Sequence, residues 1–153
     1  MPTTFGRFAM PGAADQRWAV DTSVAVASID QHHLSHSVAR QAIISRRPVL
    51  AGHAAFETLS VLTRLPGALR LSEAEAVDAT TAMFGAPCWL SATQQQAFYV
   101  KLRKQGVAGG AIYDALVGEA ARVHQRRLLT ADVRAARTYG LIGVEIELVP
   151  FAT

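Results

Sequence analysis

Trp18-Ala19-Val20-Asp21 is a short apolar run that ends in an acidic residue, and Leu128-Leu129-Thr130-Ala131-Asp132 repeats the arrangement far along the chain. Runs of this length are typical of strands that are buried on both faces of a parallel sheet. Open α/β sheets bind ligands at the carboxyl ends of their strands, so we expect both acids at the ligand-binding edge. A cap on a following turn or helix is the ordinary alternative for each, and for Asp132 the two roles are compatible.

Helical patterns alternate with short apolar runs along the rest of the chain. Further strands are expected at residues 48–50, 88–90 and 143–149, and the last alternates as a strand near a sheet edge does. Ser72 and Glu75 have the spacing of a capping box. Helices are expected over residues 34–46, from residue 56 up to the stop at Pro66-Gly67, and over 72–85, 91–106, 111–125 and 132–139. This order predicts an α/β domain with a mainly parallel central sheet flanked by helices on both faces.

Composition narrows the class of protein. The chain has 153 residues, of which 50% are hydrophobic and 18% charged, which excludes a disordered chain and fits one domain. Its single cysteine, Cys88, excludes an internal disulfide and a cysteine-based metal cage. No run approaches the roughly 18 apolar residues of a membrane span. We therefore expect a soluble cytoplasmic protein with no membrane partner, in which residues 1–17 are a loose extension and residues 18–150 form the domain.

The charge balance allows RNA as a partner without requiring it. The chain has 15 basic and 12 acidic residues, a formal net charge of +3. Arginine outnumbers lysine, and its planar guanidinium suits phosphate contacts. A codon bias toward arginine and alanine explains the same composition equally well.

Two further acids sit in otherwise apolar helical segments. Glu57 lies between Phe56 and Leu59, where a helix start favours an acid through the macrodipole. Asp114 shares a helical stripe with Gly110 and Gly118, and each glycine costs a helix about 1 kcal/mol relative to alanine. Small neighbours would leave room for a ligand to approach this carboxylate, whereas a satisfied buried aspartate is the ordinary alternative.

If the four acids converge, they need a compensating charge. Two carboxylates about 4 Å apart repel by about 4 kcal/mol at an effective dielectric constant near 20. Oxygen ligands without histidine or cysteine suit Mg²⁺ or Mn²⁺. Such a metal is suited to phosphodiester hydrolysis, because it generates hydroxide and offsets charge on the leaving oxygen.

Four segments follow one another along the chain: Ala19-Val20-Asp21-Thr22-Ser23-Val24, residues 56–66, residues 109–116 and Leu128-Leu129-Thr130-Ala131-Asp132. In this order they resemble the motifs of PIN-domain ribonucleases, and the closest group is the VapC toxins of bacterial toxin–antitoxin pairs. The resemblance runs from about Trp18 to Val149 and includes the tail over residues 138–148. Some relatives carry a further acid just after the fourth motif, where this chain has Val133 and Arg134.

The resemblance implies a metal-dependent endoribonuclease that acts as a toxin. It implies Thr130 and Thr22 as hydroxyl-bearing neighbours of the site, a small antitoxin that covers the site, and a homodimer. Arg64, two turns after Glu57, is a candidate contact for a substrate phosphate, and an ordinary solvated arginine is the alternative. The acidic metal site implied by the resemblance, for Mg²⁺ or Mn²⁺, consists of Asp21, Glu57, Asp114 and Asp132.

Two other α/β classes with acidic sites fit the chain less well. A phosphoacceptor receiver domain needs two adjacent acids after the first strand and a late lysine, but here Asp21 is alone and the last lysine is Lys104. A haloacid-dehalogenase-type phosphatase needs an aspartate where this chain has Ser23. A non-catalytic RNA-binding or regulatory α/β module stays open as the alternative function.

Three large aromatic residues are expected in the core rather than in a base-stacking platform, namely Trp18, Trp89 and Phe98.

Overall fold

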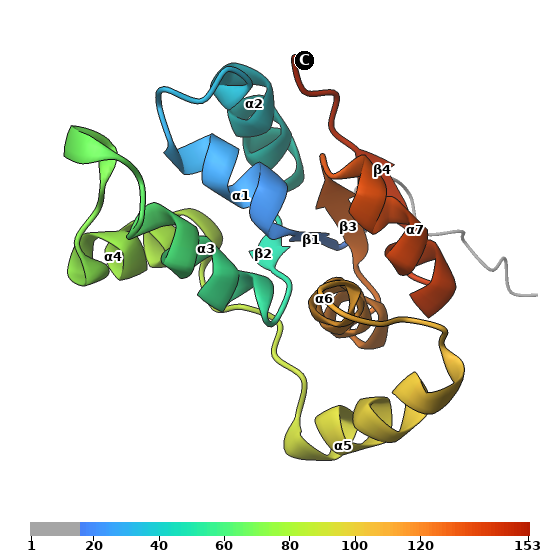
Figure 1. The fold of residues 1–153 in the computed structure, drawn as a ribbon. Helices are drawn as coiled ribbons and strands as arrows, with labels where there is room; N and C mark the ends of the chain where they lie inside the picture. Colours follow the sequence, from blue (N-terminus) through green and yellow to red (C-terminus); the bar gives the residue numbers. More distant parts are fainter. Residues whose placement is uncertain (1–15) are drawn as a thin grey trace, which may run out of the picture.

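A computed structural model describes residues 16–153, and in that range four parallel strands form one central sheet (Figure 1). The strands β1 (Trp18–Val20), β2 (Val49–Leu50), β3 (Arg127–Thr130) and β4 (Ile146–Leu148) lie in the order β2-β1-β3-β4. Each adjacent pair is parallel. The predicted α/β class and the position of the last strand at a sheet edge are therefore confirmed. Of the predicted extension over residues 1–17, residues 1–15 lie outside the described residues.

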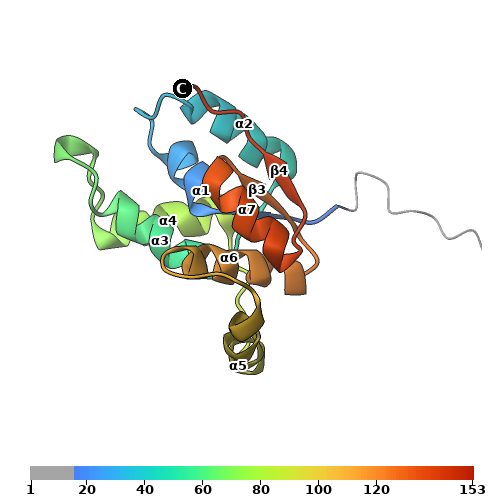
Figure 2. The same ribbon diagram turned by 45° about the vertical axis from the view of Figure 1, so that its right-hand side comes forward.

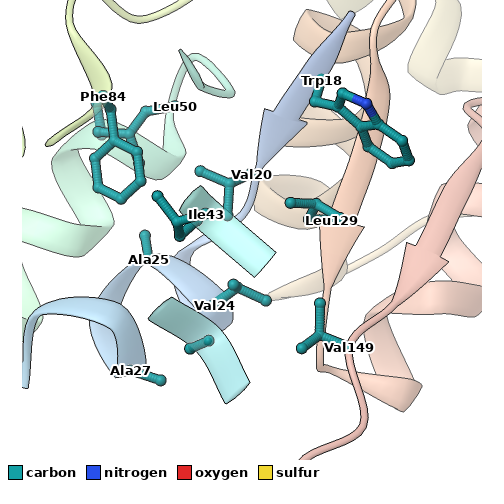
Figure 3. Close-up of a cluster of buried hydrophobic side chains, with 12 residues drawn as sticks. Trp18, Val20, Val24, Ala25, Ala27, Ile43, Leu50, Phe84, Leu129 and Val149 are labelled. Carbon is teal, nitrogen blue, oxygen red and sulfur yellow. The ribbon is translucent and has the colours of Figure 1, made fainter. Parts of the chain in front are cut away.

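Helices cover both faces of this sheet, as predicted. Val20 and Leu129 belong to an apolar cluster with side chains of α1 (Thr22–Ile29) and α2 (His36–Arg46) (Figure 3). Their neighbours along the strands, Ala19 and Leu128, belong to a second cluster with α6 (Ala111–Val123) and α7 (Val133–Ile142). Successive residues of a strand point to opposite faces, so each strand contributes to both clusters.

The other helices lie beside the sheet rather than over it. Helix α3 (Ala54–Leu62) follows β2 directly, and α4 (Glu73–Phe84) begins with the predicted capping box of Ser72 and Glu75. Helix α5 (Ala92–Lys101) projects away from the sheet in both views (Figures 1 and 2). No helix among residues 16–153 is long and apolar enough to cross a membrane.

One predicted strand is absent from the described residues, and one helix was not predicted. Helix α1 has no counterpart among the predicted helices, because its residues are apolar on every side and show no helical period; it lies against the sheet, and Asp21 caps it. Residues 88–90 do not form a strand. The Cys88 amide donates one hydrogen bond of 2.9 Å to the Leu50 carbonyl at the end of β2, and the segment then turns away.

Three smaller corrections concern the exposed surface. Leu34 precedes α2 and is exposed rather than part of its apolar face. Phe56 lies on α3 as expected but is also exposed, as is nearly half of Trp89. The helix expected over residues 91–106 ends at Lys101 and continues only as a short 3-10 turn over Leu102–Lys104.

Candidate active site

Two of the four predicted acids lie at the carboxyl ends of adjacent strands, and each also caps a helix. Asp21 follows β1, and its Oδ1 accepts hydrogen bonds from the amides of Ser23 at 3.1 Å and Val24 at 3.4 Å. Asp132 follows β3, and its Oδ1 accepts from the amides two and three residues further on, at 2.9 and 3.2 Å. Because β1 and β3 are parallel neighbours, both acids lie at one edge of the sheet. Each acid therefore both caps a helix and lies at the carboxyl edge of the sheet, so the two interpretations are compatible.

A dense set of hydroxyl groups fixes Asp21, which is only 4% exposed. Its Oδ1 also accepts a hydrogen bond from the Ser23 hydroxyl, and that hydroxyl accepts one from the Ala131 amide at 2.9 Å. Its Oδ2 accepts hydrogen bonds from the hydroxyl of Thr130 and, at 3.0 Å, from the phenol of Tyr139. These contacts connect β1, β3 and α7 around one carboxylate.

Burial and hydrogen bonding act on Asp21 in opposite directions. Burial raises its pKa, whereas the hydrogen bonds from Ser23, Thr130 and Tyr139 favour the charged form. Burial and the nearby charge of Asp21 also raise the pKa of Tyr139 above its usual range. The phenol therefore keeps its proton at neutral pH and acts as a donor to Asp21.

Glu57 reaches the same region from α3. Its Oε2 accepts a hydrogen bond of 2.8 Å from the Thr22 hydroxyl at the start of α1. Its Oε1 lies 3.6 Å from Nε2 of His53, the residue that immediately precedes α3. Thr22 and Thr130, the two hydroxyl-bearing residues implied by the resemblance, thus each contact one of the four acids.

Asp114 completes the group from the first turn of α6. Burial, followed by the charges of Asp132, Glu57 and Asp21, raises the pKa of Asp114 to about 6. Asp21, Glu57 and Asp132 thus all lie close enough to Asp114 to affect its carboxylate electrostatically. No residue between 16 and 153 donates a hydrogen bond to the Asp114 carboxylate, and the charge of Arg134 offsets the raised pKa only in part.

The donor set suits a hard cation. Among residues 16–153, no three histidine, cysteine or carboxylate side chains converge closely enough to hold one ion in their present conformations. The acids nevertheless supply only oxygen donors, and their mutual repulsion at Asp114 is of the kind that a bound cation relieves. Both hydrogen bonds to Asp132 fall on Oδ1, which leaves Oδ2 outside the cap. Asp114, Asp132 at Oδ2 and Glu57 at Oε1 thus have carboxylate oxygens outside the hydrogen-bond network.

Other residues singled out from the sequence lie differently. Arg64 lies beyond the end of α3, is exposed, and donates from Nε to the Ser60 carbonyl at 3.0 Å. Gly110 has open space at its Cβ position, whereas a Cβ on Gly118 would lie 3.0 Å from Cδ1 of Tyr139. Gly118 therefore makes room for Tyr139, and not for a ligand at Asp114.

Sequence reasoning assigned no role to Ser23 or Tyr139. Ser23 follows Asp21 by two positions, and Asp-x-Ser is a local signal for a side chain that turns back on its neighbour. Tyr139 is 118 positions away from Asp21 and has no such local signal. Its contact arises only from the packing of α7 against α6 and the sheet.

Comparison with known proteins gives a consistent result. The PIN domain family profile matches residues 19–141. Ribonuclease VapC27 of Mycobacterium tuberculosis (strain ATCC 25618 / H37Rv) is 43% identical over 128 residues, which cover 84% of this chain and 93% of that protein. Ribonuclease VapC40 of Mycobacterium tuberculosis (strain CDC 1551 / Oshkosh) is 42% identical over 135 residues, covering 86% and 98%. No solved structure gives a significant match.

Proposed function

The chain belongs to the PIN domain family, within its VapC-type ribonucleases, and from that premise we propose that it is a metal-dependent endoribonuclease that acts as the toxin of a toxin–antitoxin pair. The observation that carries the proposal is that Asp21 and Asp132 follow adjacent parallel strands, while Thr22, next to Asp21, donates a hydrogen bond to Glu57, and the charges of these three acids also act on Asp114. It indicates four carboxylates gathered at the carboxyl edge of a parallel sheet, where open α/β sheets bind their ligands. All four lie within the range matched by the family profile.

We assign different tasks to the four acids. Asp114, Asp132 and Glu57 would bind Mg²⁺ or Mn²⁺ directly, since each has a carboxylate oxygen outside the hydrogen-bond network. Asp21 contributes negative charge from a fixed position, and Glu57, held by the Thr22 hydroxyl, borders the site from α3. Bound Mg²⁺ or Mn²⁺ would supply an activated water and neutralise charge on the phosphate. Arg64 is the candidate for contact with a substrate phosphate beyond the end of α3.

The main alternative is a non-catalytic RNA-binding or regulatory module, and metal dependence distinguishes the two. The purified chain is incubated with total RNA after EDTA treatment and dialysis, and Mg²⁺ or Mn²⁺ is then added back. We expect no cleavage in EDTA and restored cleavage with either ion, because the site has only oxygen donors. Binding of RNA without cleavage under all conditions would favour the alternative module.

The site variant Asp132→Asn serves as a control for contaminating nucleases. It should be inactive under conditions in which the wild-type chain cleaves. Full cleavage by the metal-stripped wild type would instead indicate chemistry without a metal. Candidate histidines for such chemistry are His53, whose Nε2 lies 3.6 Å from Oε1 of Glu57, and His124. Sequencing the 5′ ends of fragments after induced expression would identify the RNA and the cleavage position.

A partner and an assembly belong to the same proposal. A ribonuclease must be restrained in the cell that makes it, so we expect a separately encoded VapB-type antitoxin that covers the acidic site. We place the protein in the cytoplasm, where its RNA substrate and the antitoxin are both made, and we expect a homodimer. The relatives named above support this only through their own designation as VapC ribonucleases.

A further inference from the structure

Four ring side chains form a continuous, largely exposed row beside the acidic site. His53 and Tyr113 are stacked, with centroids 5.2 Å apart and planes 19° apart. Phe56 lies 6.3 Å from His53 and 5.2 Å from Trp89. The rings come from α3, from α6, and from the segment between α4 and α5. We call these four residues the aromatic row.

The exposure of the row is not explained by packing. Phe56 is 58% exposed, Tyr113 54% and Trp89 45%. By contrast, Trp18 and Phe98 are buried in apolar clusters, as the sequence predicted. A group of large apolar side chains that touch one another and still face solvent usually marks a binding surface.

The row begins at the acidic site. His53 Nε2 lies 3.6 Å from Glu57 Oε1, and Tyr113 immediately precedes Asp114 in α6. The stacking of His53 on Tyr113 brings the start of α3 and the start of α6 side by side. A nucleic acid whose phosphate lies at the four acids must extend outward over neighbouring surface, and the row is part of that surface.

We propose that the aromatic row binds unpaired bases of the RNA substrate by stacking, next to the cleavage site. This inference rests on the proposed ribonuclease function and adds to it the residues that would hold the substrate's bases. Bases offer a π-face whatever their identity, so stacked rings hold a strand without reading its sequence. Bases that are already paired and stacked in a duplex cannot spread onto such rings. A second copy of the chain is the competing occupant of the row, and the test below separates the two.

Tryptophan fluorescence gives a direct measurement, since the chain has two tryptophans, Trp18 and Trp89. Trp18 is buried, so a ligand on the row changes mainly the emission of Trp89. The protein is titrated in EDTA with an unstructured oligoribonucleotide of mixed sequence, its duplex form, and an abasic oligomer of the same length. We expect quenching by the single strand, and at least tenfold weaker binding of the duplex and of the abasic oligomer.

Matched variants locate the effect. Phe56→Ala and Tyr113→Ala should each weaken single-strand binding about tenfold, whereas Phe56→Tyr, which keeps a ring, should retain it. Tyr99→Ala removes a ring that is 74% exposed and lies outside the row, and should have no effect. Trp89→Phe should abolish the quenching while binding, measured by filter retention, persists. Because the substituted side chains are exposed, an unchanged melting temperature is expected for the alanine variants.

Several results would overturn the proposal. Equal binding of all three oligomers, or unchanged binding by both alanine variants, would show that the row does not hold bases. The row would instead be a contact between two copies of the chain if Trp89 emission changed with protein concentration and not with RNA, and if Phe56→Ala sedimented as a smaller species than wild type. Cleavage of the same RNA is measured separately after addition of Mg²⁺. Cleavage without quenching would reject base binding by the row alone. Quenching without cleavage would reject the ribonuclease function and leave RNA binding by the row.

Discussion

The phenol of Tyr139 donates a hydrogen bond of 3.0 Å to Oδ2 of Asp21, and so connects α7 to the carboxyl end of β1. Tyr139 is 1% exposed and Asp21 4%, so water has no access to replace the bond. The Thr130 hydroxyl donates to the same oxygen. Asp21 is therefore held in one orientation by side chains that themselves lie in the second apolar cluster or at the end of β3.

Removing the phenol hydroxyl should weaken both the fold and the site. Tyr139→Phe keeps the buried ring and deletes one hydrogen bond to a carboxylate, which costs about 1–3 kcal/mol of unfolding free energy. Apparent Mg²⁺ affinity in RNA cleavage should fall about tenfold, because a group that fixes the charged Asp21 carboxylate beside the metal site is lost. Urea denaturation and a Mg²⁺ titration of cleavage measure the two effects. Tyr99→Phe, on an exposed tyrosine, is the control, and equal behaviour of the two variants would show that the Tyr139 hydroxyl has no positioning role.

Gly118 should matter through Tyr139. An alanine Cβ at this position would lie 3.0 Å from Cδ1 of Tyr139 and 3.4 Å from Cγ1 of Val144. Alanine favours the helix by about 1 kcal/mol, but displacing a buried ring costs about 1–3 kcal/mol, so Gly118→Ala should lower the unfolding free energy by about 1 kcal/mol. The displaced phenol should also bind Asp21 less well, so cleavage should fall.

The same helix offers a matched control for Gly118→Ala. Gly110 lies two helical turns earlier, has helical dihedral angles, and has nothing within 4 Å of the point that an alanine Cβ would occupy, so Gly110→Ala should be neutral or slightly stabilising. In a Tyr139→Phe background the ring is no longer held by its hydroxyl, so the cost of Gly118→Ala should shrink. Thermal unfolding of the wild type, Gly118→Ala, Tyr139→Phe and the double variant measures the coupling between the two residues. Additive effects would mean that Gly118 acts independently of the Tyr139–Asp21 bond.

Asp114 should make stability depend on pH. Its pKa is raised in the folded chain to about 6 from an ordinary value of 3.8, so folding favours the protonated form. Above about pH 6 the carboxylate is charged in the folded, metal-free chain, and its full cost to the unfolding free energy is present. This cost disappears as the pH falls toward 3.8, the ordinary pKa of the group. Asp114→Asn should be about 1 kcal/mol more stable than wild type at about pH 7.5, and the difference should vanish near pH 4.

Urea denaturation of the metal-free proteins across this pH range measures the difference. Asp78→Asn, on an exposed position of α4, should show no such pH-dependent gain. Asp114→Asn should also lose RNA cleavage while it stays folded. A folded variant that cleaves at the wild-type rate would remove Asp114 from the proposed mechanism.

The sequence predicted the parts of the site that local patterns encode. The apolar runs before Asp21 and Asp132 identified two strands, and parallel pairing placed both acids at one edge. Glu57 and Asp114 were recognised because an acid is unusual in an apolar helical segment. The aromatic row was not predicted, because whether Phe56 and Trp89 face the core or solvent depends on how α3 meets the segment before α5.

Helix α1 and Tyr139 were missed for related physical reasons. A helix that packs closely against a sheet is apolar on several sides, so its period disappears from the sequence. The contact between Tyr139 and Asp21 is made by tertiary packing of α7, and no local spacing relates residues so far apart in the chain. The fold class was thus accessible from patterns of a few residues, whereas the hydrogen-bond network around Asp21 required the three-dimensional structure.

A groove beside the acids is where we expect the proposed antitoxin to bind. It has a volume of about 500 Å³ and is bordered by Asp132. Its lining is mainly apolar and comes from α1, from α3, from the start of α7 and from the C-terminal segment, with Val26, Val61, Ala131, Val133 and Phe151. An amphipathic helix could bury its apolar face there, as helices do in other grooves. At the acid end of the groove, a basic side chain could pair with the carboxylates in place of the metal.

Inhibition should therefore depend on two separable contacts. Replacing by alanine the arginine or lysine of the antitoxin that reaches the acids should weaken inhibition of cleavage, while the complex still forms through the groove. Substituting Val133→Asp on the toxin, at a side chain that is 73% exposed, should instead weaken the complex itself, since it places a charge on the apolar lining. Co-purification measures complex formation, and RNA cleavage at saturating antitoxin measures inhibition. If the basic residue can be removed with inhibition unchanged, the block is steric and the antitoxin does not recognise Asp21, Glu57, Asp114 and Asp132 by charge.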